Sequence, residues 1–243
     1  MIKRIIQFTQ LGKFGRFGNQ LFQYAFARAY AEKYDATLEI PSWIGEKVFK
    51  NVCHHKPSRK LPRTGIDCFP NGKINIDLFG YCQKQEYINI LSEAKMKGWF
   101  QFQDKWLEFF NMPRPDTVFH IRRGDYSDKY PNVFCVVSEG SYIAACKKFG
   151  VSIDDVIWKR EENQIKDTRF PADLMFLPDF FDMIKAKNLF RANSTFSFWA
   201  GFFSHGKVYS PLVDDLVGEC DVEFVEGNWP RIVSVNPNFI IRN

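Results

Sequence analysis

Two adjacent arginines stand directly after a short apolar segment in the second half of the chain. Residues 117–121 predict a buried strand, and Arg122 and Arg123 follow it. Cations at the end of a buried strand are costly unless an anion or a carboxylate meets them. The planar fork of arginine matches phosphate oxygens, so the pair favours a phosphate-bearing ligand. Asp125 would orient one guanidinium, accept a proton from an acceptor group, or form a structural ion pair.

A glycine-rich loop, Gly12–Gly18, separates a predicted strand at residues 3–9 from a predicted helix at residues 19–34. Its glycines lack the spacing of the dinucleotide-binding fingerprint. They still permit a tight turn and a close approach of a ligand to the backbone. Asn19 would lie at or near the start of the helix, where its amide either caps the helix or faces a ligand.

A third segment, Asn193–Ala200, carries hydroxyl side chains at a predicted strand-to-helix junction. Such residues cap a helix, and the free amides of the first turn can bind a phosphate. An ordinary N-cap would show the same pattern. Asn193-Ser194-Thr195 also matches an N-glycosylation acceptor, but nothing in the sequence directs the chain to a secretory lumen.

Strands alternate with helices along the chain, which predicts parallel α/β layers. The other predicted strands are 37–40, 76–82, 188–192, 207–210 and 221–225, and the other predicted helices are 86–97, 104–111, 141–149, 173–187 and 193–204. The break at Pro113-Arg114-Pro115 predicts two domains, 1–114 and 115–243. We expect two Rossmann-type halves with parallel sheets facing a cleft, with ligands beyond the carboxyl ends of the strands.

Residues 41–75 contain four scattered prolines and no clear period, which predicts a loop-rich insertion and a candidate for acceptor contacts. The stretch Lys56–Arg63 inside it is basic and contains two prolines, so we interpret it as a solvated loop. The net charge is only +5. A nucleic-acid-binding protein would usually show denser basic clustering, so no nucleic-acid partner is expected.

Six cysteines are scattered without framework spacing, which favours free thiols in a reducing compartment. The sequence shows no signal peptide and no run of about 20 apolar residues, so we expect a cytoplasmic protein without a transmembrane segment. Cys53, His54, His55 and Cys68 could be drawn as a zinc site, but their spacing fits no common pattern.

Four segments together resemble, in order, the motifs of glycosyltransferase family 11, which contains the α-1,2-fucosyltransferases. They are Gly15–Tyr24 (GRFGNQLFQY), Gly80–Gln83 (GYCQ), Val118–Tyr126 (VFHIRRGDY) and Asn193–Ala200 (NSTFSFWA). The resemblance implies a GT-B fold with the acceptor on the N-terminal side and the nucleotide sugar on the C-terminal side. It also implies inversion at the anomeric carbon, GDP-β-L-fucose as donor, a glycan as acceptor and no metal.

The resemblance also implies roles for individual residues. Arg122 and Arg123 match the arginines that hold the diphosphate, and His120 matches a histidine near the donor. The final motif, expected around the donor phosphates, is matched by Asn193, Ser194, Thr195, Phe196 and Ser197. Asn19 matches an amide that related protein O-fucosyltransferases place near the reacting centre, and we include Gly18 beside it among the donor-binding candidates. Arg122, Asp125 and Asn19 are the catalytic candidates.

The sequence departs from the family pattern at a Ser-Asp-Asp segment that usually contacts the nucleoside. Here the nearest match is Val151–Asp155, in which Asp154 or Asp155 would bind guanine or ribose. The Asp-x-Asp motif of many metal-using glycosyltransferases does not occur in the sequence. Arginines and backbone amides must then meet the charge of departing GDP. The alternatives are a transferase for another sugar nucleotide and an inactive carbohydrate-binding relative.

Overall fold

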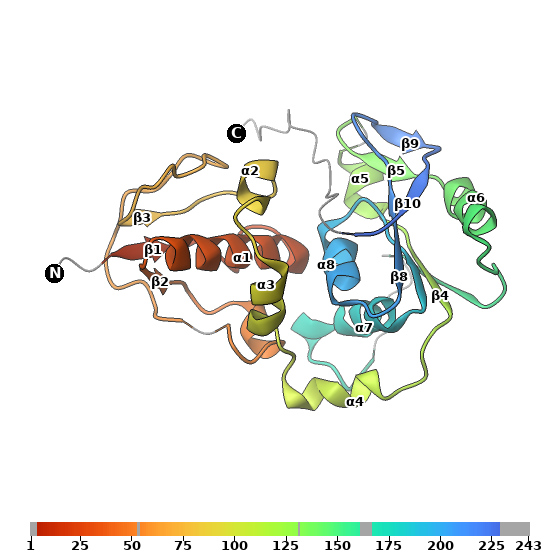
Figure 1. Ribbon diagram of the computed structural model, residues 1–243, viewed down its shortest axis with the longest axis horizontal. Helices are drawn as coiled ribbons and strands as arrows, with labels where there is room; N and C mark the ends of the chain where they lie inside the picture. The colour runs from red at the N-terminus through yellow and green to blue at the C-terminus, as the bar shows by residue number, and fades with distance from the viewer. Residues whose placement is uncertain (1–3, 53, 131, 161–166, 229–243) are drawn as a thin grey trace. The chain divides into compact units, whose positions relative to one another are not determined.

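The computed structural model describes residues 4–52, 54–130, 132–160 and 167–228, except for the side chain of Asp125. The chain divides into two compact units, Met1–Leu107 and Glu108–Asn243. The predicted domain boundary lies a few residues further along, after Arg114. Each unit is built on a parallel sheet with helices, so the predicted α/β class is confirmed (Figure 1).

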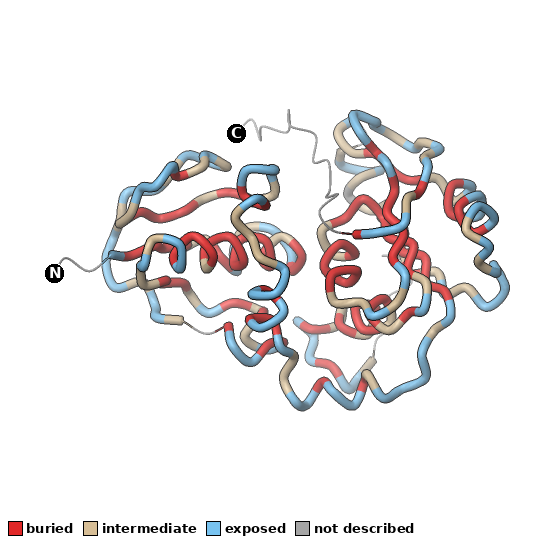
Figure 2. The backbone as a smooth tube through the Cα atoms, in the orientation of Figure 1, coloured by how far each residue is buried: buried red, intermediate tan, exposed pale blue. Residues whose placement is uncertain are grey.

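The N-terminal unit contains three parallel strands in the order β2-β1-β3. They are β1 (Ile5–Gln7), β2 (Thr37–Glu39) and β3 (Ile76–Asp77). Helix α1 (Phe17–Lys33) joins the first two strands, and its alanines suit both helix formation and close packing. Most of α1 is buried, as Figure 2 shows by its colour. The remaining elements are the 3-10 turns η1 (Ile44–Lys47) and η2 (Asp104–Trp106), α2 (Gln85–Ile88) and α3 (Glu93–Trp99).

The C-terminal unit contains a five-stranded sheet in the order β10-β8-β7-β4-β6. Four strands run parallel, namely β4 (Thr117–His120), β6 (Val156–Lys159), β7 (Asn188–Phe190) and β8 (Lys207–Pro211). β10 (Phe224–Glu226) is antiparallel to β8. A separate parallel pair is formed by β5 (Cys135–Val137) and β9 (Gly218–Cys220).

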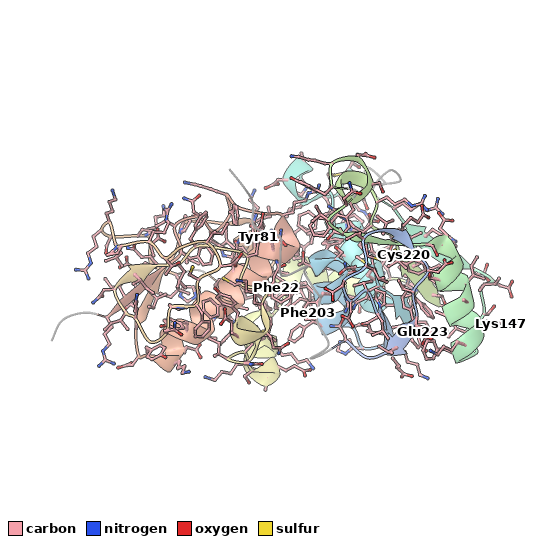
Figure 3. The ribbon with its side chains drawn as sticks, turned by 90° about the horizontal axis from the view of Figure 1, so that it is seen from above. Phe22, Tyr81, Lys147, Phe203, Cys220 and Glu223 are labelled. Carbon is pink, nitrogen blue, oxygen red and sulfur yellow. The ribbon has the colours of Figure 1, made fainter. Side chains whose placement is uncertain are left out.

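The helices of this unit are α4 (Leu107–Phe110, beginning at the boundary), α5 (Gly124–Asp128), α6 (Glu139–Phe149), the 3-10 turn η4 (Ala172–Leu174), α7 (Leu177–Lys185) and α8 (Thr195–Phe203). Phe119 and Ile121 pack with Tyr142 of α6 in one apolar core. Because side chains alternate along a strand, His120 lies on the opposite face, where Phe196 of α8 is its neighbour. Figure 3 labels Lys147 on the exposed side of α6.

Several predicted elements differ from the structure. The predicted strand 76–82 ends at Asp77, and the backbone at Gly80 and Cys82 has positive φ angles. The predicted helix 86–97 is divided into α2 and α3, because Ser92 caps a new helix through a hydrogen bond from Lys95 N to its Oγ. Strands β5, β6 and β9 were not predicted.

Candidate functional site

The carboxyl end of β4 lies at the topological switch point of the C-terminal sheet. From β4 the chain passes to β6 on one side and then returns to β7 on the other. In open parallel sheets this reversal leaves a crevice beyond the carboxyl ends of the strands, where ligands bind. His120 and Arg122 stand at this end of β4, and the start of α8 follows β7. The fold therefore brings the second and third sequence segments to one sheet edge.

A row of buried polar side chains ends the four parallel strands at this edge. Lys159 of β6 pairs with His120 of β4, and Arg191 and Ser210 follow the paired residues Phe190 and Tyr209. Their exposed fractions lie between 2% and 8%. We call Lys159, His120, Arg191 and Ser210 the polar row. Most buried polar side chains in proteins are hydrogen-bonded, so such a row indicates a constrained and specific arrangement.

His120 is neutral in this environment. Burial, with the positive charges of Arg122 and Arg191, lowers its pKa to about 3. Its Nδ1 atom is buried and has no hydrogen-bond partner within the described parts of the chain. Its ring lies beside Phe196, with centroids 5.8 Å apart. A neutral imidazole cannot contribute a charge to a phosphate site, but it can offer one ring nitrogen to a donor or acceptor group.

Arg191 is a buried cation that the sequence analysis did not single out. Its Nε donates to Ser210 Oγ over 2.6 Å, and burial lowers its pKa to about 10, so it stays charged at neutral pH. Ser210 Oγ donates in turn to the carbonyl of Gly227. The available signal was an arginine inside the otherwise apolar predicted strand at residues 188–192.

Lys159 was also missed, because its strand was not predicted. Its Nζ lies 2.9 Å from Asp179 Oδ1 and 2.8 Å from Asp182 Oδ2, both on α7. Burial alone would lower the pKa of Lys159, but hydrogen bonds to Asp182 and Asp179 raise it above the ordinary value. This ion triad fastens the end of β6 to α7.

The two adjacent arginines have different surroundings. The Arg122 guanidinium carbon lies 5.2 Å from the centroid of the Tyr126 ring, and that ring stacks on Phe134 at 4.2 Å. A guanidinium held over an aromatic ring is constrained in orientation by the cation–π contact. Arg122 also lies close enough to His120 to depress the pKa of that histidine. Of the two arginines, Arg122 is the one associated with the polar row.

Arg123 forms ion pairs with two carboxylates. Its Nη2 lies 3.2 Å from Glu219 Oε1 on β9 and 3.5 Å from Glu139 Oε1 on α6. Glu139 also pairs with Arg160 at 2.9 Å. The structural alternative raised for this motif therefore holds for Arg123, whose carboxylate partners among the described side chains are Glu219 and Glu139. Asp125 lies in α5, and its side chain is outside the described residues.

The start of α8 uses its hydroxyls mainly within the chain. Ser194 Oγ accepts from Phe196 N at 3.2 Å and caps the helix. Ser197 is fully buried and its Oγ donates to the carbonyls of Ala192 and Ser194, so this hydroxyl faces the backbone instead of a ligand. Thr195 is half-buried at the first helical position, and Asn193 is buried just before the cap. The first-turn backbone amides other than Phe196 N, which the cap uses, remain candidates for binding a phosphate.

Asp154 and Asp155 do not reach this edge. They form an exposed turn before Val156, at the amino end of β6, where Asp154 accepts from Ser152 Oγ and Asp155 has a φ angle of 58°. Since β6 runs parallel to β4, its amino end lies at the opposite edge from Arg122. The nucleoside contact expected for these two residues is thus not supported by their placement.

In the N-terminal unit, the glycine-rich loop and the Gly80–Gln83 segment are joined by side-chain amides. Gln83 Nε2 donates to Asn19 Oδ1 over 2.9 Å, and Gln23 Nε2 donates to the carbonyls of Phe14 and Gly80. Tyr81, labelled in Figure 3, packs on Phe14 with ring centroids 4.4 Å apart. The two motifs form one hydrogen-bonded assembly.

Asn19 and Gly18 lie within α1, which begins at Phe17, two residues before the predicted start. Asn19 is therefore not the cap residue, a position held by Arg16. A Cβ atom at Gly15 would meet the Asn19 amide nitrogen at 2.7 Å, and Gly15 has a φ angle of +80°. Glycine at position 15 thus permits both the turn and the close approach of the Asn19 side chain.

The neutral state of His120 predicts acid sensitivity. Its folded pKa of about 3 lies below the unfolded value of about 6.5, so the unfolded chain alone binds this proton between those values. Stability should fall as pH drops below 6.5, by about 1.4 kcal/mol per pH unit from this group. Urea unfolding between pH 4.5 and 6 gives the slope of the unfolding free energy against pH. In His120→Asn this slope should be smaller than in the wild type by the equivalent of one proton. An unchanged slope would contradict the assigned neutral state.

Groups suited to a metal ion are not evident in the described ranges: no three His, Cys, Asp or Glu side chains gather there. Cys53, part of the zinc alternative, lies outside the described residues. Among the helices that the structure describes, none has the length and apolar character to cross a membrane.

Residues 107–210, a little under half of the chain, match the model of glycosyl transferase family 11. This match includes the polar row and the start of α8, and it confirms the resemblance predicted from the motifs. No curated protein sequence matches the chain.

Similar solved structures confirm the GT-B-like fold. A crystal structure of NodZ α-1,6-fucosyltransferase soaked with GDP-fucose is 13% identical, with a TM-score of 0.56 over 93% of this chain and 99% of that one. A second crystal structure of fucosyltransferase NodZ, from Bradyrhizobium, is 12% identical with a TM-score of 0.54, over 93% of this chain and all of that one (100%).

Proposed function

We propose that this protein is an inverting, metal-independent fucosyltransferase. It transfers L-fucose from GDP-β-L-fucose to a hydroxyl of an acceptor glycan, forming an α-1,2 linkage to galactose. The observation that carries the proposal is the convergence of Arg122, His120 and the start of α8 at the switch point of a sheet in the family-matched region. The α-1,2 linkage rests on the motif resemblance alone, and the NodZ enzymes of similar fold form α-1,6 linkages by their name.

The reaction is a single displacement. The acceptor oxygen attacks the anomeric carbon of fucose, and the bond between that carbon and the phosphate oxygen breaks as GDP leaves. Negative charge grows on the diphosphate, and Arg122 with the first-turn amides of α8 would stabilise it. Arg191 adds a fixed positive charge beneath the same edge. Asp125, in the same motif, is the proposed partner for the proton or for an arginine.

Asn19 is expected to act as a hydrogen-bond donor. Gln83 Nε2 donates to Asn19 Oδ1, which fixes the orientation of the Asn19 amide so that its NH₂ group points away from Gln83. A carboxamide presented in this way cannot remove a proton from the acceptor. It can hold an oxygen of the sugar or of the acceptor.

Replacing Gln83 by glutamate should reverse this orientation, because a carboxylate accepts where the amide donated. We expect Gln83→Glu to lower kcat by about tenfold, the cost of one misdirected hydrogen bond, with little change in GDP affinity. Gln85→Glu, an exposed position two residues further along, is the matched control. Equal turnover in both variants would show that Asn19 has no orientation-dependent role.

Thermal stabilisation by a panel of nucleotides tests the proposed donor. GDP and GDP-fucose at a hundredfold excess over the dissociation constant should each add about 2.7 kcal/mol of stability. Equal stabilisation by UDP-glucose or UDP-galactose would favour a transferase for another sugar nucleotide.

Transfer should also persist in excess EDTA. Loss of transfer in EDTA with recovery in manganese would contradict metal independence, and donor binding without any turnover would indicate a carbohydrate-binding relative.

A further inference from the structure

Residues 55–64 of the insertion form a segment that we call the basic strap. It carries Lys56, Arg59, Lys60 and Arg63, all exposed, and it contains no acidic residue. Arg63 pairs with Asp77 at 2.9 Å. Within the described residues, the other three cations form no ion pair. The proposed donor site, which lies in the other unit, makes no use of them.

The basic strap crosses the N-terminal sheet from one side to the other. At β2, Ser58 donates through its N–H and its Oγ to the Glu39 carboxylate, at 3.0 and 2.8 Å. At β1, Gln7 Nε2 donates to the carbonyl of Arg59 at 2.9 Å. The middle of the strap is therefore held by the last residues of two neighbouring strands.

The far end of the strap is held by β3. Asp77 N donates to the carbonyl of Pro62 and Thr64 N donates to the carbonyl of Asp77, both at 2.8 Å. Glu39, Gln7 and Asp77 occupy one level of the sheet, and their exposed fractions are 1%, 0% and 4%. Buried carboxylates are costly unless they are hydrogen-bonded, so the sheet and the strap stabilise one another.

This anchoring has an electrostatic consequence. A flexible basic loop loses conformational entropy when it binds an anion, whereas a strap whose backbone is already fixed loses much less. Its cations stay on long exposed stems above a rigid backbone. Such a surface suits a ligand with several negative charges, since single exposed ion pairs contribute little.

The strap also contacts the segment that precedes the motif holding Asn19. Arg63 Nη2 donates to Thr9 Oγ1 at 2.8 Å, at the start of the segment that leads to the glycine-rich loop. Just beyond the strap, Asp67 Oδ1 accepts the N–H groups of Tyr81 and Cys82, which precede Gln83. The strap and the neighbouring Asp67 thus contact the segments that lead to the glycine-rich loop and to Gln83, in the same unit as Asn19.

We propose that the basic strap binds anionic groups of the acceptor, so that the acceptor is an acidic glycan bearing sulfate, carboxylate or phosphate. This inference rests on the proposed function, because it names the class of its acceptor. A glycan is favoured over a nucleic acid for two reasons. The strap contacts the segment that precedes the Asn19 motif, and its four cations lie within a single segment of ten residues, without the extended basic surface typical of nucleic-acid binding.

Binding measurements with defined probes test this inference. The probes are a sulfated galactose oligosaccharide, its unsulfated parent and a single-stranded DNA of equal charge, at low and at physiological salt. The variant is Lys56→Gln/Lys60→Gln. Its matched control is Lys33→Gln/Lys105→Gln, two exposed lysines of the same unit outside the strap. The stabilisation by GDP is measured on each protein as a separate readout of the donor site.

We expect the sulfated probe to bind the wild type more tightly than its parent, with an affinity that falls as salt rises. Removing the two strap lysines should weaken it by about tenfold, and the control pair by less than about twofold. Equal weakening by the control pair, or equal binding of the DNA, would overturn the inference. If GDP still stabilises the same proteins, only the inference about the acceptor fails. If GDP does not stabilise even the wild type, the proposed function itself is contradicted.

Discussion

Arg122→Ala should lower kcat/KM for transfer from GDP-fucose by a hundredfold to a thousandfold, the usual scale for losing one preorganised donor to a developing anion. The free energy of unfolding should change by less than about 1 kcal/mol, because the partly exposed guanidinium stacks on Tyr126 near the surface. Arg122→Lys should recover little, since an ammonium cannot make the two-pronged contact with phosphate oxygens. Steady-state kinetics and urea unfolding on the same proteins measure both quantities.

Arg169→Ala is the matched control for the charge of Arg122. Arg169 is exposed and pairs with Asp167 in the segment before α7. It should leave both turnover and stability nearly unchanged. A structural role for Arg122 would give a different result. Arg122→Ala would then lose several kcal/mol of stability with unchanged GDP affinity, as expected when an ion pair is broken and a carboxylate is left buried. The donor site would then have to be sought elsewhere in the chain.

Lys159→Met should destabilise the protein by about 3–5 kcal/mol at pH 7, because it leaves two carboxylates of α7 without their shared cation. The raised folded pKa of Lys159 means that its stabilisation is complete below the unfolded pKa and is lost as pH rises through the folded one. In the variant, Asp182 keeps a longer pair with Lys185, whose Nζ lies 3.6 Å from its Oδ1, whereas the buried Asp179 loses the cation that it contacts. An uncompensated carboxylate costs less once it is protonated. The deficit should therefore shrink as pH falls toward 4.

Urea unfolding at pH 7 and pH 4.5 measures this effect. Lys148→Met is the control, since Lys148 pairs with Glu223 at 3.1 Å in an exposed ion pair worth less than about 1 kcal/mol. A deficit below 1 kcal/mol for Lys159→Met, or one that does not depend on pH, would show that the triad is not a coupled buried unit. Glu223, labelled in Figure 3, lies just before β10.

Local patterns were sufficient for much of the fold. The strands β1, β4, β7 and β8 and the helices α1, α6, α7 and α8 were predicted within a few residues, because each has its own hydrophobic period or cap. The order of the four motifs was also sufficient to predict the family resemblance. These features depend on residues that are neighbours along the chain or lie one turn apart.

The site required contacts that no local pattern contains. β6 was missed because it is a short edge strand of four residues, and without it neither the switch point nor Lys159 could be placed. Its direction, fixed by pairing with β4, put Asp154 and Asp155 at the opposite edge. Arg123 met its carboxylates on α6 and β9, 16 and 96 residues further along the chain.

The residue types alone predicted which chemistry the chain can offer: arginines for a phosphate-bearing ligand, an asparagine beside a glycine turn, and a capped helix start. Only the tertiary structure decided which of those groups are used in contacts within the chain. Ser197 donates to the carbonyl of Ala192, Arg123 pairs with glutamates, and Gln83 orients Asn19 across 64 residues of sequence. A hydrogen bond forms between any donor and acceptor that the fold brings within about 3 Å, however far apart the two residues are in the sequence.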